Sequence, residues 1–156
     1  MAGCYVWQVL EAVRVDAAGD SRRPGVTEVH TAASLGAIPT IRAVAVDLAA
    51  RAGFDRDAIA DLQVALEDAC ARLIGLAAAD STLRCSFVPV RCEGIEVTAE
   101  VDVDKVTDPV PTGSFGWWVL QCLTDEVTAV ILPGDAGGGA RVCLMLIKRA
   151  LTVGPW

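Results

Sequence analysis

The sequence lacks several features that mark common functional classes. It contains a single histidine, His30, and its six cysteines form no Cys-x-x-Cys pair, so neither a zinc site nor a Ser-His-Asp triad is expected. No apolar run reaches the roughly 18 residues that a transmembrane helix needs. The opening residues also lack the basic start of a signal peptide. We therefore predict a cytosolic protein with no metal site and no membrane partner.

Aromatic residues and positive charge are also scarce. Aromatics make up 5% of the chain, so the core must be built from aliphatic side chains. The net charge is -7 at pH 7, and a negative surface repels phosphate backbones, so direct binding of nucleic acid is not expected. A role in gene regulation would then act through a protein partner. Cys70, Cys122 and Cys143 lie in apolar runs and are predicted to be buried, reduced thiols.

What is present is one ordinary globular domain with a short addition at each end. Its 156 residues are 53% apolar and 21% charged, which is typical of a folded chain with a substantial core. Residues 1–25 are predicted to be an N-terminal extension and linker, because they end in a polar stretch rich in Gly and Pro. Tyr5 and Trp7 make this extension a candidate for docking elsewhere. The domain is predicted to span 26–150, and 151–156 form a tail.

Hydrophobic periodicity predicts the order strand, helix, helix, two strands, helix, two strands. Pro39 opens the first helix, Gly53 ends it, and Asp55 caps the second. The strands are expected at 26–32, 82–90, 95–103, 127–132 and 141–148, and the helices at 39–53, 56–78 and 115–126. This order favours an α/β two-layer sandwich, with a mixed, mostly antiparallel sheet covered by helices on one face.

The last predicted helix has an apolar face formed by Phe115, Trp118, Val119, Cys122 and Leu123. Trp117 falls off that face. It is equally consistent with a protein interface, where tryptophan is enriched, and with burial under a neighbouring loop.

Three blocks of sequence occur in an order and spacing that match a known pattern. They read Asp61-Leu-Gln-Val-Ala-Leu-Glu-Asp-Ala-Cys-Ala-Arg, Gly116-Trp-Trp-Val-Leu-Gln-Cys-Leu-Thr-Asp-Glu-Val and Gly138-Gly-Ala-Arg-Val-Cys-Leu. Together they resemble the RsbW/SpoIIAB-type anti-sigma factors of the GHKL ATPase superfamily, and most closely the actinobacterial, mycobacterial-type members. The resemblance covers about residues 26–150.

The resemblance implies a GHKL, Bergerat-like fold and a homodimeric anti-sigma factor. Such a protein sequesters an alternative sigma factor and is released by an anti-anti-sigma factor. The alternative is an active ATP-dependent serine kinase that phosphorylates the anti-anti-sigma factor. ATP is the implied ligand, in a weak or altered mode, and a role for Mg²⁺ stays open.

Carried over residue by residue, the resemblance puts the catalytic carboxylate at Asp68, with Glu67 adjacent. The family's Mg²⁺-ligating asparagine is replaced by Arg72, whose guanidinium has no lone pair for a metal. Arg72 either pairs with Asp68 on the helix surface, which is the favoured interpretation, or binds a phosphate directly.

The other nucleotide-binding positions also depart from the family pattern. The adenine-reading aspartate falls on Val101, and Ala140 replaces a threonine. The remaining cofactor-binding candidates are Asp102, Asp104, Gly113, Gly116 and Gly139. The two aspartates are close substitutes for the missing one. The glycines could admit a phosphate before a helix or simply form turns.

Overall fold

The computed structural model describes residues 25–90, 94–104, 112–134 and 139–150. Within these ranges five strands form one sheet in the order β1-β2-β3-β5-β4. The strands are β1 (Thr27–Ala32), β2 (Thr82–Val90), β3 (Gly94–Val103), β4 (Glu126–Pro133) and β5 (Ala140–Arg149). All four pairings are antiparallel, so the described sheet contains none of the parallel pairs that a mixed sheet would have.

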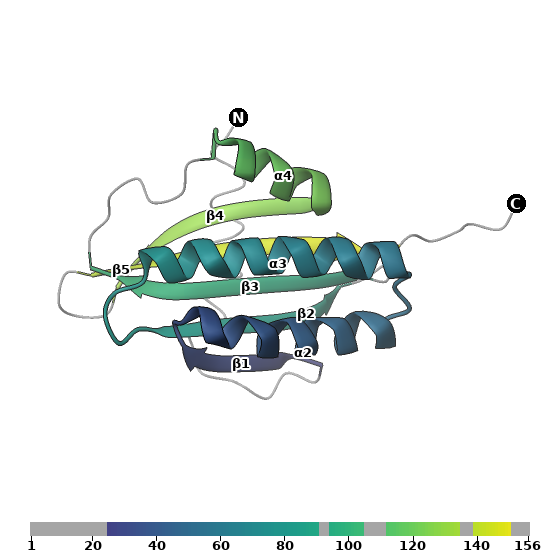
Figure 1. Ribbon diagram of the computed structural model, residues 1–156, viewed down its shortest axis with the longest axis horizontal. Helices are drawn as coiled ribbons and strands as arrows, with labels where there is room; N and C mark the ends of the chain where they lie inside the picture. The colour runs from purple at the N-terminus through teal and green to yellow at the C-terminus, as the bar shows by residue number, and fades with distance from the viewer. Residues whose placement is uncertain (1–24, 91–93, 105–111, 135–138, 151–156) are drawn as a thin grey trace, which may run out of the picture.

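The helices make the second layer of the predicted α/β sandwich, which is confirmed. They are α2 (Ile38–Arg51), α3 (Arg56–Leu76) and α4 (Phe115–Leu123), and a short 3-10 turn, η1 (Leu35–Ala37), precedes α2. Figure 1 shows α2 and α3 side by side across one face of the sheet, with α4 beyond α3 and next to β4. In the described part of the chain, no helix combines the length and apolar character needed to cross a membrane.

Local signals set the start and end of α2 and the start of α3 as predicted. Pro39 occupies the first turn of α2, where a missing N–H costs nothing, and Gly53 follows the helix with a positive φ of 81°. At the start of α3, the carboxylate of Asp55 accepts a hydrogen bond from the backbone N–H of Ala58 at 2.7 Å. This cap satisfies one of the helix's free donors, and such caps contribute about 1 kcal/mol.

The core lies between the helices and the sheet and is mainly aliphatic. The helix-facing side of β3 is formed by the buried residues Ile95, Val97, Ala99 and Val101. The alternate residues of β3 are polar and partly exposed, which confirms the predicted strand with one wet face. From α3, the buried side chains are Leu62, Leu66, Ala69, Cys70 and Leu73.

Helix α4 corrects the predicted assignment of its faces. Trp117 is only 5% exposed and Leu120 is fully buried, whereas Phe115 and Trp118 are 77% and 57% exposed. Cys122, predicted to be buried, is exposed. The prediction failed because this helix is apolar on nearly every side, so periodicity cannot choose the buried face. Packing against α3 and β4 makes that choice.

The other described thiols are buried, as predicted for Cys70 and Cys143. Cys70 and Cys85 lie in the core between α3 and β2. A hydrogen bond with Cys70, together with burial, raises the pKa of Cys85 well above its usual range. Because the thiolate is the reactive form, the Cys85 thiol is chemically quiet in the folded protein.

Candidate functional site

The candidate site begins on α3, where Asp68 and Arg72 lie one turn apart. The Nε of Arg72 donates a hydrogen bond to Oδ2 of Asp68 at 2.7 Å. The favoured interpretation of Arg72 as a partner of Asp68 is therefore correct in this structure. Pairs of this kind on a helix surface contribute about 0.3–0.5 kcal/mol, so their main effect here is positional. The carboxylate expected to act as a base is held by a fixed positive charge.

Arg72 also reaches the first turn of α4. A side-chain carbon placed on Gly116 would overlap the guanidinium of Arg72, so the glycine makes room for it. Ser114 caps the same turn, and its Oγ accepts a hydrogen bond from the N–H of Trp117 at 3.2 Å. The N-terminal end of a helix carries partial positive charge, so a cation beside it is unfavourable unless an anion is near. Asp68 supplies that negative charge in the structure.

Glu67 points to a different partner from its neighbour Asp68. Its Oε1 accepts a hydrogen bond from Nη1 of Arg42 at 2.6 Å, which joins α3 to α2. Glu67 therefore forms an ion pair that joins two helices, and this pair does not include Arg72. Arg42 was not singled out from the sequence, because Arg42 and Glu67 are 25 residues apart along the chain and their contact leaves no local signal.

Lys148 is a second residue that the sequence did not single out. Its Nζ lies 3.2 Å from Oδ2 of Asp61 on α3 and donates a hydrogen bond to the backbone oxygen of Leu123 at 3.0 Å. Leu123 is the last residue of α4, and cations are favourable near the negative end of a helix. Lys148 thus ties β5 to both helices and helps to hold α4 in place beside α3.

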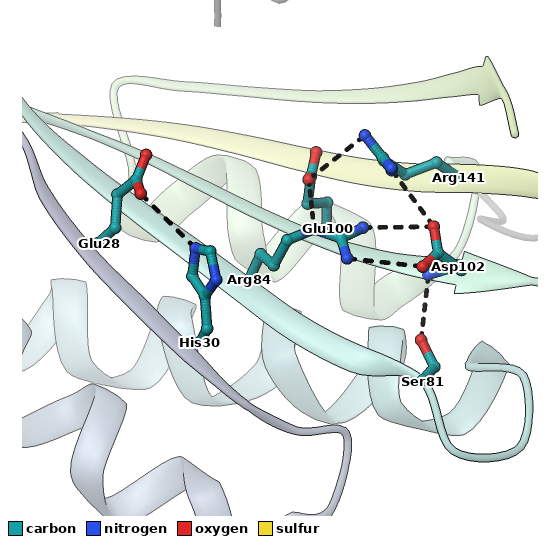
Figure 2. A network of polar contacts seen from close by, with 7 residues as sticks. All are labelled: Glu28, His30, Ser81, Arg84, Glu100, Asp102 and Arg141. Atoms are coloured by element: carbon teal, nitrogen blue, oxygen red, sulfur yellow. Dashed lines mark hydrogen bonds and ion pairs between the residues drawn. The ribbon is translucent and has the colours of Figure 1, made fainter. Parts of the chain in front are cut away.

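Asp102 lies on the opposite face of the sheet from α3. Figure 2 shows its carboxylate with Arg84 of β2 and Arg141 of β5, at 3.2 Å and 3.3 Å respectively. Arg84 also pairs with Glu100 at 2.7 Å. Val101 faces the helices in its place and is fully buried. Asp102 is therefore not brought to the group formed by Asp68 and Arg72.

The charges around Asp102 change how it titrates. Partial burial alone would raise its pKa, but the hydrogen bonds and positive charges of Arg84 and Arg141 lower the pKa below the usual value of 3.8. Burial likewise tends to lower the pKa of Arg84, and its contacts with Glu100 and Asp102 raise it overall. The four charges form a compensated network on the face of the sheet that is turned away from the described helices.

The remaining predicted residues fall at two places. Gly113 is exposed and directly precedes Ser114, the N-cap of α4, so it belongs to the same segment as Gly116.

The second place is the end of β3. Gly139 lies beside it, because a carbon added to Gly139 would sit 3.1 Å from the backbone oxygen of Val103. Asp104 is exposed immediately after Val103. The structure thus groups Asp68, Arg72 and Gly116, and separately groups Asp104 with Gly139.

These side chains do not fit a magnesium ion. At the position where the family resemblance puts a metal ligand, the guanidinium of Arg72 already pairs with Asp68. Mg²⁺ prefers oxygen ligands in an octahedral arrangement, and a fixed cation repels it. Among the residues that the structure describes, no group of three His, Cys, Asp or Glu side chains is arranged to hold a metal.

Fold and site together define an ATPase-like α/β domain in which a long, carboxylate-bearing helix packs on an antiparallel sheet. The model of the histidine kinase-like ATPase domain matches residues 31–145. The chain therefore belongs to that family.

Comparison with individual proteins shows which members of the family this chain is similar to. The chain is 36% identical over 110 residues to the anti-sigma-F factor RsbW of two Mycobacterium tuberculosis strains. That match covers 70% of this chain and 64% of each relative, so the chain aligns with less than two thirds of their length. The fold is similar to a crystal structure of the RsbU and RsbW domains of a Mycobacterium tuberculosis protein, with a TM-score of 0.50 and 22% identity. The similarity covers 81% of this chain and 35% of that one. These matches confirm the resemblance found in the sequence.

Proposed function

We propose that this protein is an anti-sigma factor that binds an alternative sigma factor in the cytosol and keeps it from RNA polymerase. The observation that carries the proposal is the 36% identity with the anti-sigma-F factor RsbW, which includes the long helix α3. The net charge of -7 supports a protein partner with a basic surface, since opposite charges accelerate association.

The exposed side of α4 is the surface that we assign to the sigma factor. Phe115 and Trp118 form a tilted aromatic pair with ring centroids 5.7 Å apart, and Cys122 continues the same side one turn further on. Large exposed aromatics of this kind are unusual outside binding sites and often dominate binding energy. The buried Trp117 and Leu120 on the other side anchor this surface to the core.

We propose that nucleotide binding, where it occurs, uses Arg72 in place of a metal. Its guanidinium lies at the start of α4, and Arg can neutralise a phosphate directly through a bidentate contact. The kinase alternative is not favoured, because Asp68 is paired with Arg72 and phosphoryl transfer relies on metal ions for charge neutralisation. An anti-anti-sigma factor would then release the sigma factor by competition, and the active form would be a homodimer.

The decisive experiment is co-elution of the purified protein with each alternative sigma factor of its host, with ATP, with Mg·ATP and without nucleotide. A stable complex with one sigma factor supports the proposal. A complex strengthened equally by ATP with or without Mg²⁺ supports the metal-independent mode. Failure to retain any sigma factor under all three conditions would overturn the proposed function. The Trp118→Ala variant is the matched control, because it should fold normally yet bind weakly.

A further inference from the structure

The open face of the sheet, which is the face turned away from α2 and α3, has a polar half and an apolar half. The polar half consists of β1 to β3 together with Arg141 of β5, and its side chains include Arg84, Glu100 and Asp102 (Figure 2). On β1, His30 lies 3.6 Å from Glu28. The apolar half, on β4 and β5, carries Val130, Cys143 and Met145. Cys143 is in register with Val130, and these two residues and Met145 lie outside the core cluster formed with the helices.

These three side chains are buried although the described helices pack on the other face. Cys143 is 1% exposed, and Val130 and Met145 are each 9% exposed. The neighbours of Met145 on the adjacent strands are Thr98 and Thr128. Threonine is shorter than methionine, and side chains stand roughly perpendicular to a sheet, so these two cannot cover the thioether. Glu96, Glu100 and Arg141 lie near Cys143 and contribute to its burial. The short threonines leave the thioether of Met145 for another segment to cover. We define the apolar patch as Val130, Cys143 and Met145.

We propose that the N-terminal extension, residues 1–24, docks on the apolar patch through the apolar stretch at 5–15. This stretch contains Tyr5, Trp7, Val9, Leu10 and Val13. The extension leads into Gly25, whose added carbon would lie 3.6 Å from Pro89 at the end of β2. Docking would shield an apolar surface that the helices leave uncovered.

The length of chain is sufficient for this path. From β1 to β5 there are three strand spacings, or about 14 Å across the sheet. The linker at 16–24 can extend over about 30 Å, which leaves room to travel along the strands as well. The tail at 151–156 also starts near this end of the sheet, but its apolar side chains, which include Leu151, Val153 and Trp156, are fewer than those at 5–15. The extension has both the reach and the greater number of apolar side chains.

The test uses the full chain with paired substitutions. In one variant, Trp7→Asp and Leu10→Asp place charges in the extension. In the matched control, Leu151→Asp and Trp156→Asp place the same charges in the tail.

The readout is the reactivity of individual side chains. Each protein is treated with N-ethylmaleimide under native conditions, and each cysteine is followed by peptide mass spectrometry. Cys122 serves as the exposed reference and Cys70 as the core reference. Oxidation of Met145 by dilute peroxide is a second reporter on the same patch.

We expect Cys143 to react about tenfold faster or more in the extension variant, because uncovering a thiol restores both access and thiolate character. Cys70 should stay protected, and the tail variant should behave like the unmodified chain. An unchanged Cys143 in the extension variant would overturn the proposal. So would a rise confined to the tail variant, or a rise in the unmodified chain on dilution, which would assign the cover to a second copy.

A second measurement guards against unfolding of the extension variant. A benzophenone side chain is introduced in place of Trp7 in the otherwise unmodified chain, with Trp156 replaced in the same way as the control. Illumination should give adducts on β4 or β5 from position 7, preferentially at Met145. Adducts from position 7 that map only to α2, α3 or α4 would overturn the proposal without any need for a destabilised protein.

Discussion

The guanidinium of Arg72 on α3 lies against Gly116 in the first turn of α4, at the place where any side chain would overlap it. The same guanidinium pairs with Asp68. One arginine thus links the two helices and occupies the position where the family resemblance puts a metal ligand. By that resemblance, a fixed positive charge stands where a metal ligand is expected.

Gly116→Ala should displace Arg72 from α4 at little cost in stability. The alanine gains up to about 1 kcal/mol of helix propensity, and the disturbed surface ion pair is worth about 0.3–0.5 kcal/mol. We therefore expect a free energy of unfolding within about 1 kcal/mol of the unmodified protein, measured by urea denaturation. In a double-mutant cycle, Arg72→Ala should cost less in the Gly116→Ala background than alone. Strict additivity of the two substitutions would contradict the contact.

Arg72→Asn should convert the site toward metal dependence. The asparagine removes the fixed cation and supplies an oxygen that can ligate Mg²⁺. We expect ATP binding to this variant, measured by calorimetry, to strengthen about tenfold with Mg²⁺, which corresponds to about 1.4 kcal/mol. Binding to the unmodified protein should be indifferent to Mg²⁺, and Arg72→Ala should bind weakly in both conditions. An unmodified protein that requires Mg²⁺ for ATP would refute the assignment of Arg72.

The adjacent tryptophans of α4 should respond in opposite ways. Trp117→Ala removes a buried side chain and should cost about 3–5 kcal/mol of stability. Trp118→Ala removes an exposed side chain and should change the free energy of unfolding by less than about 0.5 kcal/mol. If α4 binds the sigma factor, Trp118→Ala should weaken that complex by about tenfold or more in a titration. Equal destabilisation by both substitutions would argue against the observed orientation of α4.

Asp102→Asn should alter the dependence of stability on pH. The folded-state pKa of Asp102 is lowered, so its contribution is present above the unfolded value near 3.8 and is lost as the pH falls through the folded value. Because the side chain is 46% exposed, the effect at neutral pH should be below about 1 kcal/mol. The difference from the unmodified protein should be largest near pH 6 and shrink toward pH 2 in urea denaturation curves.

Asp104→Asn is the matched control for that prediction. Asp104 is an exposed carboxylate two residues further along the chain, just past the end of β3. Its substitution removes one exposed negative charge next to the network and so controls for the change in net charge alone. A pH profile for Asp102→Asn that runs parallel to the unmodified one at all pH values would rule out the proposed role of the ion pairs.

The sequence alone determined the features that depend on short stretches of chain. The cap at Asp55, the helix end at Gly53 and the alternation along β3 all follow from local rules about backbone donors, φ angles and the two faces of a strand. The ion pair between Asp68 and Arg72 is equally local, because residues four apart meet on a helix surface. The family resemblance then identified the ATPase-like fold.

Tertiary packing alone decided the contacts between distant segments. Only the folded chain shows that Glu67 turns to Arg42 and that Asp102 joins charges on the open face of the sheet. Likewise, α4 is apolar on most sides, so its buried face depends on which neighbours surround it and not on its own periodicity. The physical reason is common to all three cases. Long-range contacts depend on how whole elements pack, and no short window of sequence contains both partners.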